Sequence, residues 1–363
     1  MTLVDRLPGG EKRRRGCRVM EAKSLSKKEL SGFLEGLRGR GYQIWGPRAS
    51  QGEAEFGLLG RGVEPLLDYR NFRLSPKIMA FPQSERMFLF STERGRQDAF
   101  ILKEVEEDGQ PQVAWGVRPC DARAFLILDK VFLVQGAMQD PYYKRKRERM
   151  VLMGLGCNSP CSTCFCHWTG GGPFSREGLD ILMTDLGERF LLEAVSQKGE
   201  ALLGGANLQG ATPEELDRAA RIAKEAQGAM GPSVDPTPIR KKPLLPTFGD
   251  AYWDRAHEPC IKCGTCTYLC PTCSCFDIQD EVRGSCGLRG RNWDSCMFPL
   301  TTLHASGHNP RPTGKERFRQ RFMHKLRYFL DDFDTIMCVG CGRCVQYCPV
   351  NIDIREIIRE LSA

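Results

Sequence analysis

Short apolar runs alternate with turns between residues 42 and 203, a pattern typical of a domain that mixes strands with helices. The runs Met87–Phe90, Gln112–Val117 and Met150–Leu155 are predicted strands. The spacing of apolar residues over Asp121–Leu133 predicts a helix directly behind the second of them. This alternation predicts an α/β or α+β region built on a mixed sheet.

Two further helices are predicted from signals at their N-termini. Ser26, with Glu29 three residues later, has the spacing of a capping box ahead of apolar residues at helical intervals. Pro213 opens a second helix, which continues through an acidic first turn and an Ala-rich body to residue 229. Both segments are therefore predicted to be helices.

A third amphipathic helix is predicted over residues 314–333. Its apolar side carries Phe318, Phe322, Met323, Leu326, Phe329 and Leu330. Its opposite side carries Lys315, Arg317, Arg319, Arg321, Lys325 and Arg327. Such a basic face predicts a docking surface for an acidic partner protein. The basic run at residues 144–147 fits either the same role or an ordinary solvated surface.

Composition divides the chain into four parts. Residues 1–19 are basic and aperiodic and are predicted to be a disordered tail. Residues 20–230 form the predicted α/β domain. Residues 231–250 contain five prolines and are predicted to be a linker. The remainder, 251–363, holds 12 of the 18 cysteines.

The cysteine content is the unusual feature of the composition. The chain has 363 residues, of which 41% are hydrophobic and 27% charged, values that are ordinary for a soluble protein. No apolar run is long enough to span a membrane, and no export signal precedes the first domain, so a cytoplasmic location is predicted. In that compartment 18 cysteines favour metal binding over disulfides. The net charge of +7 does not distinguish between an anionic ligand, nucleic acid, an acidic protein partner and an ordinary solvated surface.

One internal repeat carries most of the functional information. The pattern C-x2-C-x2-C-x3-C-P occurs twice, starting at Cys260 and at Cys338, with a glycine at the same place in each copy, Gly264 and Gly342. Three cysteines at intervals of three can bind three corners of a [4Fe–4S] cube from one loop. In paired motifs of this kind the fourth cysteine ligates the other cluster.

This rule predicts two crossed ligand sets. The first cysteine set consists of Cys260, Cys263, Cys266 and Cys348. The second cysteine set consists of Cys338, Cys341, Cys344 and Cys270. Zinc fits poorly, because structural zinc sites generally use two separated C-x2-C halves.

The two motifs are separated by 67 residues, which include the helix predicted at 314–333. The region 251–363 therefore resembles the α-helical ferredoxins found in the iron–sulfur subunits of fumarate reductases and heterodisulfide reductases. The expected fold class is α+β: a mixed-sheet N-terminal domain followed by an all-α helical-ferredoxin domain with two [4Fe–4S] clusters.

Cysteines before residue 231 suggest a third site. Besides Cys17 in the tail, they are Cys120, Cys157, Cys161, Cys164 and Cys166, here called the N-terminal cysteine set. Cys120 and Cys157 each follow a predicted strand, and loops at the ends of adjacent strands meet at one sheet edge. A third cluster is predicted on Cys120, Cys157, Cys164 and Cys166, with Cys161 as the spare. Free thiols, or a zinc site that includes His167, are the alternatives. Cys273, Cys275, Cys286 and Cys296 are surplus to the clusters and are expected to be small buried residues.

Several stretches also resemble a known protein family. They are AWGVRPCDARA, CSTCFCHWTGGGP, CIKCGTCTYLCPTCSCFDI, WDSCMF and ASGHNPRP. They are similar to the iron–sulfur beta subunits of sulfhydrogenases and to the corresponding iron–sulfur subunits of anaerobic sulfite reductases, from about Leu25 to the C-terminus. Related dicluster subunits occur in flavin-containing oxidoreductases that feed heterodisulfide reductases.

The resemblance implies an electron-carrying subunit of a multi-subunit oxidoreductase of anaerobic metabolism. Its partners would be a flavoprotein that handles NAD(P)H and a hydrogenase, sulfite reductase or heterodisulfide-reductase-like subunit. The chain is not expected to be catalytic alone, to bind nucleic acid or to span a membrane. The alternative is that the N-terminal cysteine set itself reduces a sulfur substrate. The sequence contains no G-x-G-x-x-G after a predicted strand and no H-E-x-x-H, so neither a dinucleotide fold nor a zincin site is indicated.

Overall fold

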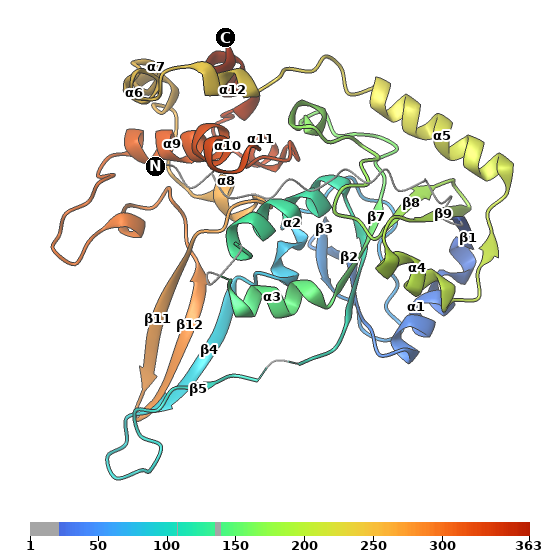
Figure 1. Ribbon diagram of the computed structural model, residues 1–363, viewed down its shortest axis with the longest axis horizontal. Helices are drawn as coiled ribbons and strands as arrows, with labels where there is room; N and C mark the ends of the chain where they lie inside the picture. Colours follow the sequence, from blue (N-terminus) through green and yellow to red (C-terminus); the bar gives the residue numbers. More distant parts are fainter. Residues whose placement is uncertain (1–21, 107, 135–138) are drawn as a thin grey trace, which may run out of the picture.

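The computed structural model describes residues 22–106, 108–134 and 139–363, and the predicted tail at 1–19 lies outside them (Figure 1). An eight-stranded mixed sheet forms the body. Its strands are β1 (Ala22–Ser26), β2 (Gln43–Ser50), β3 (Glu53–Leu58), β6 (Gln112–Val117), β7 (Met150–Leu155), β8 (Ile181–Asp185), β9 (Arg189–Ala194) and β10 (Gln209–Gly210). Their order is β10-β1-β9-β8-β7-β6-β2-β3. The pairs β2–β6, β6–β7 and β7–β8 are parallel, and the outer pairs are antiparallel.

Helices cover this sheet because its central strands are apolar throughout. Every residue of β7 is buried, which requires cover on both faces. The cover comes from α1 (Leu30–Gly39), α2 (Pro119–Phe132), α3 (Pro141–Glu148), α4 (Gln197–Gly204) and α5 (Pro213–Gly228). The capping box of Ser26 and Glu29 is present ahead of α1, where it caps the 3-10 turn Lys27–Glu29. Strands β6 and β7 begin and end at the residues that the sequence predicts.

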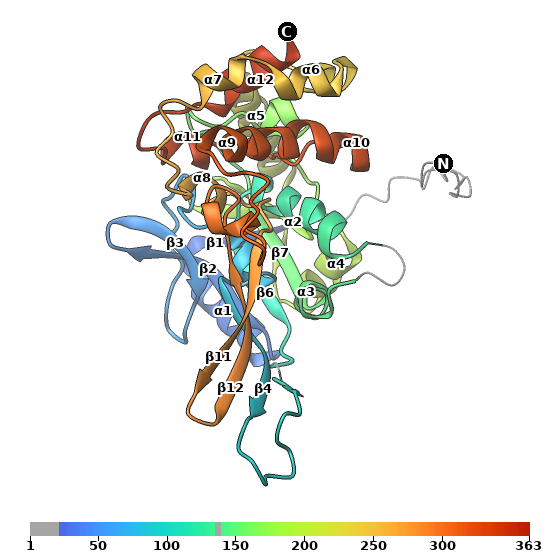
Figure 2. The same ribbon diagram turned by 90° about the vertical axis from the view of Figure 1, so that its left-hand side faces the viewer.

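A second, antiparallel sheet is built from both halves of the chain. Its strands are β4 (Ser84–Ser91), β5 (Lys103–Glu104), β11 (Phe276–Arg283) and β12 (Cys286–Trp293), in the order β11-β12-β4-β5. It projects from the body as an arm (Figure 2). Gly287 in β12 lies opposite Phe90 in β4, and a Cβ at Gly287 would lie 2.1 Å from the Phe90 ring. Glycine therefore lets the two strands pair there.

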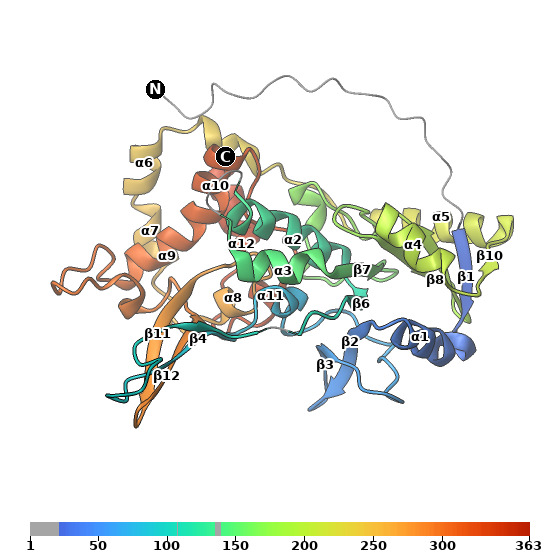
Figure 3. The same ribbon diagram turned by 60° about the horizontal axis from the view of Figure 1, so that its bottom comes forward.

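The rest of the C-terminal half is helical, stacked on one side of the sheets (Figures 2 and 3). Its helices are α6 (Leu244–Gly249), α7 (Tyr252–Ala256), α8 (Thr265–Tyr268), α9 (Gly314–Met323), α10 (Phe329–Phe333), α11 (Arg343–Gln346) and α12 (Ile354–Ser362). Further 3-10 turns are at Pro76–Met79, Cys166–Thr169, Thr237–Lys241 and Pro299–Thr302. The expected α+β class is confirmed, but the predicted all-α character of the C-terminal domain is wrong, because that domain contributes β11 and β12 to the second sheet. No helix in the described ranges is long and apolar enough to cross a membrane.

The helix predicted at 314–333 is continuous, with a π turn at His324–Tyr328 between α9 and α10. Its apolar side packs as predicted: Phe318, Phe322 and Leu326 share a core with Trp253 of α7. The predicted proline-rich linker is partly helical, since it contains α6 and the turn Thr237–Lys241.

The prediction that the basic side of this helix is a docking surface is wrong for four of its six residues. Arg317, Arg321, Lys325 and Arg327 are each less than a tenth exposed. Arg327, for example, donates to the carbonyl oxygens of Ile239 and Lys242. A helix that is enclosed on several sides buries its polar face too, and helical periodicity by itself does not reveal this.

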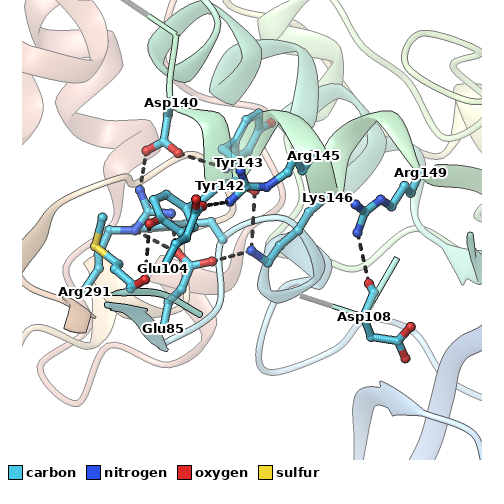
Figure 4. A network of polar contacts seen from close by, with 12 residues as sticks. Glu85, Glu104, Asp108, Asp140, Tyr142, Tyr143, Arg145, Lys146, Arg149 and Arg291 are labelled. Atoms are coloured by element: carbon cyan, nitrogen blue, oxygen red, sulfur yellow. Dashed lines mark hydrogen bonds and ion pairs between the residues drawn. The ribbon is translucent and has the colours of Figure 1, made fainter. Parts of the chain in front are cut away.

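The basic run at 144–147 lies in α3 and is used inside the molecule (Figure 4). Arg145 pairs with Glu104 and Lys146 with Glu85, which attaches α3 to the second sheet. Glu85 also accepts from Arg291 of β12, and Arg291 pairs in turn with Asp140, the N-cap of α3. This network fixes the arm on the body. The basic run therefore forms ion pairs within the molecule.

Candidate metal centres

One cavity brings together the four members of the first cysteine set. Cys260, Cys263 and Cys266 come from the loop that leads into α8, and Cys348 comes from the end of the second motif. Gly264 sits in the left-handed region with φ +76°, as the tight turn requires, and a Cβ there would lie 2.9 Å from the Phe298 ring. The rest of the lining is mainly apolar, with Met297, Phe318 and Ile352, and it also includes Arg321 as well as Cys344 of the second set.

The second cysteine set is buried more deeply. Burial raises the pKa of the Cys338 thiol to about 11 and those of Cys341 and Cys344 to about 12. The Cys270 sulfur is close enough to all three to perturb their titration. Protonated thiols are favoured at such a place only while no metal is bound, because thiolates are the form that ligates iron. The structure thus brings Cys270 of the first motif next to the three leading cysteines of the second.

Two buried cations lie beside these thiols. Lys325 Nζ is 3.3 Å from Cys270 Sγ, 3.0 Å from Thr272 Oγ1 and 3.2 Å from the Met337 carbonyl oxygen. Arg321 donates to the Cys266 carbonyl oxygen at 3.1 Å. Neither has a carboxylate partner within the described residues. Burial disfavours the charge of Lys325, but the nearby Cys270 and Cys273 sulfurs outweigh it and raise its pKa.

Because these buried cations have no carboxylate partners, they indicate that the sites hold an anionic group. An isolated buried charge is costly, so such cations need an anion close by. A [4Fe–4S] cluster on four thiolates carries net negative charge and supplies one. In the described ranges no three His, Cys, Asp or Glu side chains lie close enough together for a single metal ion. The donor set and the charge pattern thus fit iron–sulfur clusters.

The N-terminal cysteine set also lines one cavity. Cys120 is the second residue of α2, just after β6, and Cys157 follows the end of β7. Because β6 and β7 are parallel neighbours, both cysteines emerge at the same sheet edge. The following loop adds the other three members. Arg118, only 6% exposed, lines this cavity, donates to the Gly156 carbonyl oxygen at 3.0 Å and has no carboxylate partner in the described part.

Within this set the structure does not separate the predicted four ligands from the spare cysteine. Cys161 lines the enclosed cavity together with the other four and also lines a neighbouring open groove. Its pKa is lowered to about 6, chiefly by the hydrogen bond from the Cys164 thiol. His167, the alternative zinc ligand, does not line the cavity; its ring contacts the Pro232 carbonyl oxygen at 3.2 Å.

The second motif is clamped against the N-terminal cysteine loop. A Cβ at Gly340 would lie 2.4 Å from the Phe165 carbonyl group, and one at Gly342 would lie 2.6 Å from that of Thr163. The Phe165 amide donates to the Gly340 carbonyl oxygen at 2.8 Å. Cys164 Sγ is 3.5 Å from the Cys341 carbonyl oxygen. The N-terminal set therefore directly adjoins the second set.

Sequence reasoning missed the cations that serve these sites. Arg118 lies in one of the family-like stretches, but nothing in its local sequence marks it as a buried cation. Arg321 and Lys325 fall on the side of their helix that was expected to be a docking face. No local sequence signal marks these two either, because their burial depends on what packs around the helix; only the structure shows that Phe318 and Phe322 of the same helix line the first cavity.

Comparison with known proteins agrees with this geometry. The model of the 4Fe–4S dicluster domain family matches residues 259–352, which span both motifs. Over 322 residues the chain is 33% identical to sulfhydrogenase 2 subunit beta of Pyrococcus furiosus, covering 88% of this chain and 92% of that protein. The chain belongs to the sulfhydrogenase beta-subunit family. It is thus an iron–sulfur protein with 4Fe–4S clusters and an electron-transfer role in oxidoreduction. No solved structure matches it.

Proposed function

We propose that this chain carries single electrons between partner subunits of a cytoplasmic oxidoreductase. Two [4Fe–4S] clusters would be held by the crossed sets, Cys260, Cys263, Cys266 and Cys348, and Cys338, Cys341, Cys344 and Cys270. The observation that carries this proposal is that Cys348 lines one cavity with the three cysteines of the other motif. The clusters would supply reversible one-electron oxidation and reduction, and the protein would set their position and potential.

The burial of the sites supports an ordered path. Cys263 and Ile261 are exposed at the first set, which places that set near the surface and suits exchange with a partner. The second set lies deeper, between the first set and the N-terminal set. The proposed path therefore runs from a surface cluster through a buried one towards the edge of the large sheet.

A third [4Fe–4S] cluster is proposed on Cys120, Cys157, Cys164 and Cys166. The shared cavity and the carboxylate-free Arg118 support an anionic group there. Thr169 Oγ1 donates to the Cys166 carbonyl oxygen at 2.9 Å, and Arg123 donates to the Thr169 carbonyl oxygen at 2.8 Å, so this end of the loop is held in place. Cys161 remains the spare, because it alone of the set also reaches the open groove.

The partners are proposed from the relative's name and from the family resemblance. The relative is a beta subunit of a sulfhydrogenase. By analogy, this chain would act beside a flavin- and NAD(P)-binding subunit and a terminal hydrogenase, sulfite reductase or heterodisulfide-reductase-like subunit. Such an analogy indicates the class of partner subunit, and the surface of this chain that binds each partner has to be determined by experiment.

The iron content of the oxygen-free full chain tests this proposal. About twelve irons, with the EPR signals of three reduced cubanes, are expected; about eight would confine the clusters to the C-terminal half. Zinc without iron would refute the proposal. The purified chain should exchange electrons with an artificial donor and acceptor but should not reduce polysulfide alone.

The groove beside Cys161 favours one alternative function, direct reduction of a sulfur substrate. Cys161, Arg70 and Asn71 line both the cysteine cavity and the open groove, so a substrate in the groove would reach the edge of the site. Polysulfide reduction by the purified chain, abolished in Cys161→Ser, would support this alternative. Retention of electron transfer without that activity would exclude it.

A further inference from the structure

One edge of the arm is a long strand that is paired on one side only. In the order β11-β12-β4-β5, β11 has β12 on one side and, among the described residues, no strand on the other (Figures 1 and 2). All eight residues of β11 are exposed. Proteins usually protect a long edge strand with Pro, Lys or a bulge, because its outward N–H and C=O groups can pair with another chain. β11 contains neither Pro nor Lys, and its ladder with β12 is regular, so its outer edge is open to strand pairing.

Exposed apolar side chains gather on the same arm. They lie on its strands or on the loop that joins β4 to β5, and each is between 42% and 69% exposed: Leu89, Phe100, Ile101, Leu102, Ile278 and Val282. Cys286 of β12, predicted to be buried, is exposed as well, because nothing in the described part of the chain covers the hairpin there. A concentration of exposed apolar side chains is typical of a surface that binds another protein.

The two faces of β11 differ in chemistry. Successive side chains of a strand point to opposite faces, so Ile278 and Val282 share one face and Asp277 and Glu281 share the other. Neither of these two carboxylates has an ion pair within the described ranges. Arg283, beside the turn, is the only basic residue of the strand. The edge therefore offers apolar side chains on one face and unpaired negative charge on the other.

A second copy of this chain fits this edge poorly. Apolar side chains of two paired strands meet only where the alternation of faces is kept. The two longest antiparallel registers of β11 with itself that keep it place Asp280 opposite its own copy, or Asp277 opposite Glu281. Like charges directly opposite each other destabilise a strand pair. The edge therefore favours a different chain, one that carries positive charge.

We propose that β11 binds an extended segment of a partner subunit as an additional strand of the arm. In that segment apolar side chains alternate with Lys or Arg, so that the apolar ones cover Ile278 and Val282 and the basic ones meet Asp277 and Glu281. In this mode of binding the backbone hydrogen bonds supply affinity and the alternate side chains supply specificity. The proposal rests on the proposed function only in assuming a complex with partner subunits.

A synthetic peptide tests the edge on the full chain, purified without oxygen. The probe alternates Val with Lys, and its controls carry Glu in place of Lys or N-methyl groups on the backbone. The Lys peptide should slow hydrogen exchange of the β11 amides and bind about tenfold more tightly than the Glu peptide, because opposite charges then face each other across the strands. Asp277→Lys with Glu281→Lys should reverse this preference. Equal binding of the three peptides, or no protection of β11, would overturn the proposal.

Measurements on the intact complex identify the segment without any variant. A reagent that joins carboxylates directly to amines should link Asp277 or Glu281 to a partner subunit, at Lys residues that alternate with apolar ones. The β11 amides should exchange more slowly in the complex than in the free chain. Links between two copies of β11, or equally fast exchange in the complex and the free chain, would overturn the proposal.

Substitutions on the apolar face separate this proposal from the proposed function. Ile278→Asp with Val282→Asp should release the partner subunit while the chain keeps its iron and its electron exchange with artificial carriers. Leu245→Asp, at a residue of α6 that is 79% exposed, is the matched control and should keep the partner. A complex that survives the double substitution would contradict the proposal. A chain without iron would refute the proposed function instead, and the peptide experiment decides the edge in either case.

Discussion

The guanidinium group of Arg343 and the carboxylate of Asp121 form a fully buried, two-bond ion pair, with N–O distances of 2.7 and 2.8 Å. Arg343 lies between two cysteines of the second motif, and Asp121 follows Cys120 at the start of α2. Arg343 also donates to the Phe72 carbonyl oxygen at 2.7 Å. One side chain thus joins the second cysteine set to the N-terminal set.

Loss of Arg343 should therefore destabilise the whole chain. Arg343→Met leaves Asp121 buried without its partner, and breaking such a pair costs about 3–5 kcal/mol. Denaturant unfolding of the holoprotein would measure the change. Arg343→Met with Asp121→Asn should recover part of it, since no buried charge remains. An equal loss in single and double variants would show that the pair itself matters little.

Crossed ligation can be tested by combining cysteine variants. Cys260 and Cys348 are assigned to one cluster, so Cys260→Ser with Cys348→Ser should lose about four irons. Cys260→Ser with Cys270→Ser removes ligands from both clusters and should lose about eight. The reverse result would mean that each motif binds its own cluster.

Lys325 should raise the reduction potential of the second cluster. Reduction adds negative charge, which the nearby ammonium group stabilises, so Lys325→Met should make that potential more negative. Loss of about 1.4 kcal/mol of this interaction corresponds to about 60 mV for one electron. Redox titration followed by EPR would measure it. Lys315→Met is the matched control, because Lys315 pairs with Asp254 away from the cysteines and should not alter the potential.

Serine substitutions of different cysteines in the N-terminal set should differ in their effect on the iron content of the chain. Cys157→Ser should remove about four irons, because Cys157 is one of the four proposed ligands. Cys161→Ser should keep them, because Cys161 is the spare. Iron loss in Cys161→Ser but not in Cys164→Ser would exchange the roles of these two residues.

His324 should make the fold sensitive to mild acid. Burial, followed by the charges of Lys325 and Arg311, lowers its pKa to about 4, so the folded chain favours the neutral ring. Between about pH 6.5 and pH 4 the unfolded chain binds the extra proton, and stability falls as the pH falls, by at most about 1.4 kcal/mol per pH unit. Unfolding curves across this window should flatten in His324→Gln. The exposed His304→Gln should behave like the wild type.

Regular local signals predict much of the fold. Strands β6 and β7 are predicted with their observed bounds, because their apolar runs are short and flanked by turns. Pro213 and the acidic first turn likewise predict the start of α5, where the structure adds a capping box of Thr212 and Glu215. Grouping of the two motif sets follows from cysteine spacing, which the shape of a cubane cluster dictates.

Long-range contacts are not predictable from such signals. The pairing of β4 with β12, and the Glu85 and Arg291 contact across it, join segments that are about 200 residues apart in the sequence. The burial of Lys325 likewise follows from what packs around its helix, and helical periodicity describes one helix only. Charged residues next to cysteines in space leave no mark in the local sequence; Lys77, for example, donates to the carbonyl oxygens of Cys270 and Cys273.

The shared second sheet has a consequence for how the chain is made. Ser91 of β4 pairs with Cys286, which the ribosome adds 195 residues later. At about 5–20 residues per second this delay is about 10–40 s. During that time β4 has only the two-residue strand β5 beside it within its sheet. The nascent chain therefore carries an open strand edge until the first motif and its hairpin have emerged, and chaperone cover during synthesis would matter most in this interval.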